Sequence, residues 1–345
     1  MMNELIRWIA QPLFMLFLCS NALALDGTLV IANRGGGSIS LYDLATSLEV
    51  ARLPIGPRIP HEVAVSPDGR WAVTAEYGPD SNRGRHLVVI DIPSARIVDR
   101  IDLGPNSRPH SVVFLPDSRR VVATMQDADE LALVDITNST VLRTYPTGGR
   151  EGHMVRLNPD ATRAYVSSRE SVGTLSVIFL EEDRAPVVIH TGAGAEGLDV
   201  TPDGSEIWVA NRREATISIV DTSSLEVIAR IDSRPFAGRV AIGPEGRVVV
   251  PNGTGGQLVP QYARVFDGTS REMINEAPLR NGEPDQGNFG VLIHDGLVFV
   301  TDPGQGNVQM FELETMAPRG VFITGHENPD GMAWSPLRVT AMREE

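Results

Sequence analysis

The sequence contains no lysine, so all 30 of its basic residues are arginines. This absence excludes Schiff-base chemistry and a lysine general base. The arginines are outnumbered by 44 acidic residues, and the formal net charge is −14 at pH 7. A chain with this charge is a poor match for nucleic acid or for an anionic membrane surface. We therefore expect neither as a partner.

Cysteine is almost absent as well, because Cys19 is the only one and lies in an apolar segment near the N-terminus. If that segment is removed, the mature protein has no thiol, no disulfide and no cysteine nucleophile. The sequence also lacks a Ser-His-Asp order, a His-Glu-x-x-His helix and a paired-cysteine motif. We therefore assign no catalytic residue.

The N-terminal segment has the features of a signal peptide. Arg7 precedes the apolar run 13–18, and Ala22 and Ala24 satisfy the small-residue rule for cleavage. This pattern predicts a signal peptide over residues 1–24 and export to the periplasm or out of the cell. An uncleaved anchor is the alternative, but the run is shorter than the ~20 residues that a spanning helix needs.

An internal repeat determines the predicted architecture. A short strand followed by a Pro-Asp-Gly-like turn recurs, as in the segments that begin at His61, His110 and Glu196. The equivalent turn residues are spaced by 49, 43, 43, 42, 50 and 42 residues: Pro67, Pro116, Pro159, Pro202, Pro244, His294 and Pro336. This period fits one four-stranded blade of a β-propeller, and seven copies predict seven blades.

Each repeat continues with a β-branched run and then a hairpin. The runs, such as 71–75 and 207–210, have the composition of strands. An acidic residue ends the first arm of the hairpin in six repeats: Asp43, Asp91, Asp135, Asp221, Asp267 and Glu312. Phe179 stands at this position in the remaining repeat, and the sequence offers no reason for it.

The ends of the chain predict how the ring closes. Residues 27–56 supply only three strands, whereas a lone strand lies near 331–335. We expect the C-terminal strand to complete the N-terminal blade and remove the exposed sheet edges of an open array. The fold class is therefore all-β, with residues 25–345 forming a single seven-bladed propeller of four-stranded antiparallel blades, which we expect to be a monomer.

Several of these segments resemble the YVTN-repeat family of propellers, which includes YncE-like and lactonase-like proteins. The resemblance rests on the Pro-Asp-Gly turns, on the Val-Asp hairpins, and on 30–33 and 208–211. It covers nearly all of the mature chain and implies the fold. It says little about function, because relatives include surface-layer proteins, lactonases and propeller domains of periplasmic metalloenzymes.

Residues at equal repeat positions form rings around the mouth of a propeller channel. Six positions before each turn residue, the ring is His61, His110, His153, Glu196, Gly238, Asn288 and Asp330. Three histidines and a glutamate on consecutive blades have the composition of a metal site for Zn, Cu or Fe. The predicted ligands are His61, His110, His153 and Glu196. Alternatively, these histidines satisfy loop carbonyls, or act as acid, base or substrate ligand.

A second ring and a set of arginines are expected on the same face. The ring, at the ends of the second strands, includes Glu76 and Asn211, and the arginines include Arg169, Arg213 and Arg239. Arginine grips carboxylates and phosphates with paired hydrogen bonds. We predict a binding site for a small anion from Arg58, Glu62, Glu76, Arg108, Arg150, Glu151, Asn211 and Arg212. The alternative is ordinary surface ion pairing with nearby glutamates.

Three functions are compatible with these observations. The first is an exported binding or accessory propeller that holds a metal or a small anionic ligand, or docks a periplasmic protein, at the channel mouth. The second is a lactonase-like hydrolase in which His and Glu or Asp, helped by Arg, activate water. The third is a structural interaction module, which needs an exposed apolar patch.

Overall fold

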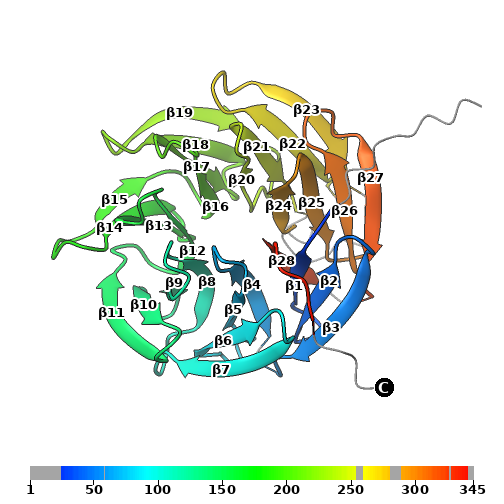
Figure 1. Ribbon diagram of the computed structural model, residues 1–345. Coiled ribbons are helices and arrows are strands. Elements are labelled where there is room, and N and C mark those ends of the chain that lie inside the picture. The colour runs from blue at the N-terminus through cyan, green and yellow to red at the C-terminus, as the bar shows by residue number, and fades with distance from the viewer. Residues whose placement is uncertain (1–24, 58, 254–258, 280–288, 326–327, 341–345) are drawn as a thin grey trace, which may run out of the picture.

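The computed structural model describes residues 25–57, 59–253, 259–279, 289–325 and 328–340. Seven four-stranded antiparallel sheets are arranged as blades around a central axis (Figure 1). The predicted seven-bladed propeller is therefore confirmed. The described residues contain no helix long and apolar enough to cross a membrane. The predicted signal peptide lies outside the described residues.

Each blade runs from an inner strand beside the axis to an outer strand at the rim (Figure 1). Blade 1 is formed by β28 (Pro329–Ser335), β1 (Thr28–Asn33), β2 (Ser38–Asp43) and β3 (Leu48–Pro54). Blade 2 is formed by β4 (Pro60–Val65), β5 (Trp71–Glu76), β6 (His86–Asp91) and β7 (Arg96–Asp102). Blade 3 is formed by β8 (Pro109–Phe114), β9 (Arg120–Met125), β10 (Glu130–Asp135) and β11 (Thr140–Pro146). Blade 4 is formed by β12 (Gly152–Leu157), β13 (Arg163–Ser168), β14 (Thr174–Phe179) and β15 (Val187–His190).

The remaining blades follow the same plan. Blade 5 is formed by β16 (Ala195–Val200), β17 (Glu206–Asn211), β18 (Thr216–Asp221) and β19 (Glu226–Asp232). Blade 6 is formed by β20 (Ala241–Ile242), β21 (Arg247–Pro251), β22 (Tyr262–Asp267) and β23 (Met273–Pro278). Blade 7 is formed by β24 (Val291–His294), β25 (Leu297–Asp302), β26 (Asn307–Glu312) and β27 (Pro318–Ile323).

Hydrophobic patterning explains which strands lie inside. The second strand of blade 5, β17, is covered by neighbouring blades on both faces, so Trp208, Val209 and Ala210 are buried in succession. The outer strand β19 instead alternates between exposed and half-buried residues, because one of its faces meets solvent. The core is therefore a set of apolar layers between adjacent blades, one of which unites β17 and β18 with β21.

The Pro-Asp-Gly turns connect inner and second strands, as predicted. In blade 5 the N–H of Gly204 donates to the carbonyl oxygen of Thr201 at 2.8 Å, and Gly204 has a φ of 73°. This left-handed conformation favours glycine, which has no Cβ to clash with the backbone.

The acidic residue of each hairpin caps a tight turn. Oδ1 of Asp221 accepts hydrogen bonds from the backbone N–H groups of Ser223 at 3.0 Å and Ser224 at 2.7 Å. Bonds from the Ser223 hydroxyl and from this turn lower the pKa of Asp221 to about 2. Seven residues separate β14 from β15, against four between β18 and β19. Blade 4 therefore lacks the four-residue turn, which explains why Phe179 stands in the acidic position.

The ring closes through β28, which confirms the predicted role of the C-terminal strand. It pairs antiparallel with β1, with Thr28 opposite Ser335 and Ile31 opposite Met332. In Figure 1 this red strand lies beside the blue β1, on the inner side of blade 1.

The inner strands approach one another closely. A Cβ atom built on Gly197 would lie 2.5 Å from Cα of Arg239 in the loop before blade 6, and one on Gly331 would lie 2.8 Å from Cα of Glu62 in blade 2. The axis is therefore narrow enough for side chains from different blades to touch there.

Candidate functional site

Three histidines meet where the inner strands begin. His61, His110 and His153 occupy the second position of β4, β8 and β12, and their exposed fractions are 6%, 0% and 1%. The ring centroid of His110 lies 3.6 Å from the ring centroid of His153 and 4.2 Å from that of His61. The sequence-predicted histidine cluster is thus assembled in the fold, because equal repeat positions converge at the axis.

The imidazoles of this cluster are neutral at pH 7. Burial lowers the pKa of His61 to about 3, and it also holds the pKa values of His110 and His153 well below the usual range. Arginines nearby, including Arg169 and Arg239, add to this effect on His153. Neutral imidazoles keep a lone pair that can accept a hydrogen bond or bind a metal.

Several imidazole nitrogens of the cluster have no hydrogen-bond partner among the described residues. These are Nδ1 of His61, both ring nitrogens of His110 and Nε2 of His153. The alternative that these histidines satisfy loop carbonyls does not describe His110. A buried polar atom without a partner costs roughly 1–3 kcal/mol. The cluster is therefore expensive to maintain as a packing feature alone.

An ion-pair network adjoins the cluster. Arg239 reaches Oε1 of Glu62 at 2.5 Å and Oδ1 of Asp330 at 3.2 Å through Nη2. Nδ1 of His61 lies 3.1 Å from Oδ2 of Asp330 and 3.3 Å from Oε1 of Glu62. Ligand atoms of His61, Glu62 and Asp330 all lie within 4.8 Å of one another. This compact group shares only His61 with the predicted set of metal ligands.

Glu196 joins the histidines to a group of arginines. Its carboxylate lies 3.6 Å from Nε2 of His153, 3.3 Å from Nη1 of Arg212, 3.8 Å from Nη1 of Arg239 and 4.0 Å from Nη1 of Arg169. Glu196 is buried, whereas Arg169 and Arg212 are half-buried. The predicted proximity of His153 and Glu196 is therefore present, but arginines surround this carboxylate.

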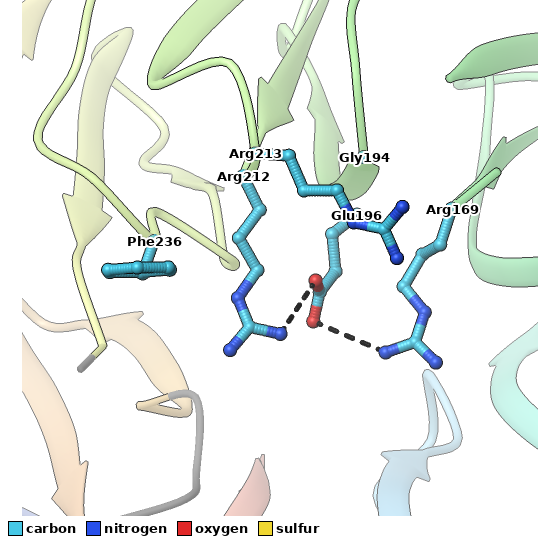
Figure 2. Close-up of a pocket in the computed structure, with 6 residues that line it drawn as sticks. All are labelled: Arg169, Gly194, Glu196, Arg212, Arg213 and Phe236. Carbon is cyan, nitrogen blue, oxygen red and sulfur yellow. Dashed lines mark hydrogen bonds and ion pairs between the residues drawn. The ribbon is translucent and has the colours of Figure 1, made fainter. Parts of the chain in front are cut away.

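A cavity of about 290 Å³ opens beside Glu196. Its lining combines three arginines, one carboxylate and one aromatic ring: Arg169, Gly194, Glu196, Arg212, Arg213 and Phe236. Figure 2 shows Arg169 and Arg212 on either side of Glu196, with Phe236 beyond Arg212. The guanidinium carbon of Arg212 lies 6.0 Å from the centroid of Phe236. The cavity thus offers cationic groups next to one apolar wall.

Other predicted ligand-binding residues lie elsewhere. Glu76 contacts His86 and Arg100 within blade 2. The amide nitrogen of Asn211 donates to the hydroxyls of Thr216 and Ser218 within blade 5. Neither residue lines the cavity, because each end of a second strand bonds to the neighbouring strand of its own blade.

The remaining predicted residues are divided between the interior and the surface. Arg108 is buried over the ring of Tyr77, 4.1 Å from its centroid, and pairs with Asp80 at 2.7 Å. Arg150 and Glu151 are exposed and do not line the cavity. Arg58 and Asn288 lie outside the described residues. Of the predicted anion-binding residues that the structure describes, Arg212 alone lines the cavity, while Glu62 belongs to the ion-pair network.

Sequence reasoning did not select Phe236 or Asp330 as site residues. Asp330 stands in the same ring position as His61, so its register was the available signal. Phe236 lies in the loop between β19 and β20 and carries no repeat signature. Its φ of 64° is a backbone feature that the sequence does not display.

Family comparisons agree with the architecture. The profile described as YNCE-like beta-propeller matches residues 115–266, and the profile described as cytochrome D1 heme domain matches residues 11–150. Over residues 115–266 the chain is similar to YncE-like β-propellers. This confirms the resemblance indicated by the repeats. No curated protein matches the sequence.

Solved structures share this propeller fold at low sequence identity. A functionally unknown protein from Desulfotomaculum acetoxidans DSM 771 has a TM-score of 0.73 and a sequence identity of 16%. The match covers 90% of this chain and 100% of that protein. Hydrazine synthase from Kuenenia stuttgartiensis has a TM-score of 0.61 and a sequence identity of 16%. The match covers 74% of this chain and 76% of the hydrazine synthase chain. The propeller domain of Myceliophteria thermophila Cps50 (Swd1) has a TM-score of 0.65 and a sequence identity of 11%. The match covers 80% of this chain and 90% of that domain. These similarities concern the fold alone.

The three histidines at the propeller axis do not offer a haem ligand at the cavity. His61, His110 and His153 pack against one another at the axis, and none of them lines the cavity. The cavity, at about 290 Å³, lies at the small end of the ~300–1,000 Å³ range of ligand pockets. None of these three histidines therefore provides an axial ligand facing this cavity.

Proposed function

We propose that this protein is an exported binding propeller that holds a small anionic molecule in the arginine-lined cavity near the start of the inner strand β16. The observation that carries the proposal is the lining itself, in which Arg169, Arg212 and Arg213 face a single carboxylate, Glu196. Three positive charges against one negative charge leave an excess that a bound anion would balance.

The neighbouring charges support this excess. The remaining buried guanidinium near the cavity, Arg239, is occupied by Glu62 and Asp330. Arg213 is exposed and has no ion-pair partner among the described residues. Arg212 contacts Glu196 through Nη1, while its Nε has no hydrogen-bond partner there. The arginines can therefore donate further hydrogen bonds to a ligand.

Binding is favoured over hydrolysis by the arrangement of the acid and base candidates. A general base for a lactone needs a carboxylate or histidine that reaches one water beside the substrate. Glu62 and Asp330 are held by Arg239, and Glu196 is surrounded by arginines. The charge distribution suits ground-state recognition of an anion.

Export is the second part of the proposal. Residues 1–24 have the composition of a signal peptide, and cleavage after Ala24 would give Leu25 as the new N-terminus. Intact-mass measurement of protein recovered from the periplasm or medium tests this. Full-length protein in the membrane fraction would contradict it.

Calorimetric titration with succinate, benzoate and inorganic phosphate tests the anion site. We expect saturable binding of at least one of these probes, weakened about 10-fold or more in Arg213→Gln, because a charge-assisted hydrogen bond contributes ~1.5–3 kcal/mol. Arg150→Gln is the matched control, since Arg150 is also an exposed arginine but does not line the cavity. Equal loss in both variants, or no binding of any probe, would refute the proposed site.

A further inference from the structure

We infer that His61, Glu62 and Asp330 form a binding site for one divalent transition-metal ion at the propeller axis. This site does not rest on the anion-binding proposal, because none of the three residues lines the cavity. Their ligand atoms lie within 4.8 Å of one another, and all three side chains are buried. They come from β4 and β28, the inner strands of adjacent blades.

The distances around His61 match those between two ligands of the same ion. Nδ1 of His61 lies 3.1 Å from Oδ2 of Asp330 and 3.3 Å from Oε1 of Glu62. For Zn–N bonds of ~2.0–2.1 Å and Zn–O bonds of ~2.0–2.2 Å, adjacent ligand atoms are separated by about 2.9–3.4 Å. Both observed separations fall within this interval.

Hydrogen bonding does not account for these contacts. Nδ1 of His61 has no hydrogen-bond partner although a carboxylate oxygen lies 3.1 Å away. The oxygens therefore lie near the nitrogen without the alignment that a hydrogen bond requires. A buried nitrogen and two carboxylates that converge without such a bond are the groups that a metal ion would satisfy together.

Arg239 holds both carboxylates, through the oxygen of Glu62 that also faces His61 and through the oxygen of Asp330 that does not. Its Nη2 binds Oε1 of Glu62 and Oδ1 of Asp330, so that Oδ2 of Asp330 is the oxygen that faces His61. Metal-binding carboxylates are commonly held by hydrogen bonds from such outer groups. One guanidinium against two carboxylates also leaves a negative charge that a divalent cation would neutralise.

The donor set indicates the class of metal. One imidazole and two carboxylates suit Zn²⁺, Fe²⁺ or Mn²⁺ better than soft Cu⁺. Three protein ligands leave a coordination position for water or for a fourth side chain. His110 is one candidate, because its ring centroid lies 4.2 Å from that of His61 and neither of its nitrogens has a partner among the described residues.

Metal analysis of the full chain, purified without a His-tag, tests the site. Chelator-treated protein titrated with Zn²⁺ should bind about one equivalent, and Asp330→Asn and His61→Gln should lose that binding. Glu196→Gln should retain it, which distinguishes this site from the set of His61, His110, His153 and Glu196. His86→Ala is the control, because His86 contacts Glu76 within blade 2.

A stability measurement keeps the test independent of misfolded variants. Zn²⁺ should raise the melting temperature of the chelator-treated parent protein, because a ligand that binds only the folded state stabilises it. If the folded parent protein binds no Zn²⁺, Fe²⁺ or Mn²⁺, the inference is overturned. Loss of the metal in Glu196→Gln with retention in Asp330→Asn would also overturn it.

Discussion

Arg239 and Glu62 are separated by 177 positions in the sequence, and Nη2 of Arg239 lies 2.5 Å from Oε1 of Glu62. Both side chains are buried. Desolvation raises the pKa of Glu62, while Arg239 opposes that rise by stabilising the carboxylate. This pair connects blade 2 to the loop that precedes blade 6, across the axis of the ring.

Removing one partner of this pair should be strongly destabilising. Arg239→Leu leaves Glu62 and Asp330 buried without their cation, so we expect a loss of about 3–5 kcal/mol in the free energy of unfolding. Urea denaturation measures it. Arg52→Leu is the control, because Arg52 pairs with Glu49 at the exposed rim and such pairs contribute roughly 0–1 kcal/mol. Equal losses would show that the central network contributes no more than a surface pair.

Ring closure gives a second prediction. Truncation after residue 328 removes β28 and leaves the inner edge of β1 unpaired, so the melting temperature should fall by about 10 °C or more. Removal of residues 341–345 is the control, because it leaves β28 intact. A truncated protein that melts like the parent protein would contradict closure through β28.

Close packing at the axis gives a third prediction. Gly197→Ala should destabilise the protein, because its Cβ would lie 2.5 Å from Cα of Arg239 and inner strands would have to separate. Gly36→Ala should have little effect, since the nearest atom to its Cβ would be the Ser38 hydroxyl oxygen at 3.6 Å. Thermal unfolding of the two variants compares them directly, and similar melting temperatures would refute the packing argument.

Acid should destabilise the chelator-treated protein through the buried histidines. His153 is faced by His110 on β8, by Gln126, by Glu196 on β16, and by Arg169, Arg212 and Arg239. Burial lowers its pKa well below 6.5, so below that pH the unfolded state binds a proton that the folded state does not. Its contribution to stability is complete above pH 6.5 and is lost as the pH falls.

Each such histidine lowers the free energy of unfolding by up to about 1.4 kcal/mol per pH unit below its unfolded pKa. Thermal unfolding of the parent protein and of His153→Gln between pH 7 and pH 5 checks this, and the variant should show the shallower decline. A decline of equal slope would show that His153 does not contribute to the acid sensitivity.

The fold was predictable from the sequence because its signals are local and repeated. The turn at Gly204 and the capped turn at Asp221 depend on neighbouring residues, and their regular spacing determines the number of blades. The convergence of His61, His110 and His153 followed from equal repeat positions. Closure followed from the missing strand of blade 1.

The candidate site was only partly predictable, because its contacts depend on distances across the ring. Glu62 and Asp330 meet through Arg239, which belongs to the loop before β20, and no local pattern connects these positions. Phe236 enters the cavity through a loop without repeat character. Glu76 and Asn211 were assigned to ligand binding because they share a ring position. Their side chains instead form hydrogen bonds to residues of their own blades.

The pairing of β28 with β1 also has a consequence for the order in which the protein is made. Strands β1, β2 and β3 are synthesised first, yet their blade receives its inner strand only after residue 335 has been added. Until then β1 presents an unpaired edge of apolar residues, and Asp330 has not yet joined His61, Glu62 and Arg239. The metal-binding group at the axis therefore cannot exist in a chain that lacks β28, and its completion coincides with the closure of the ring.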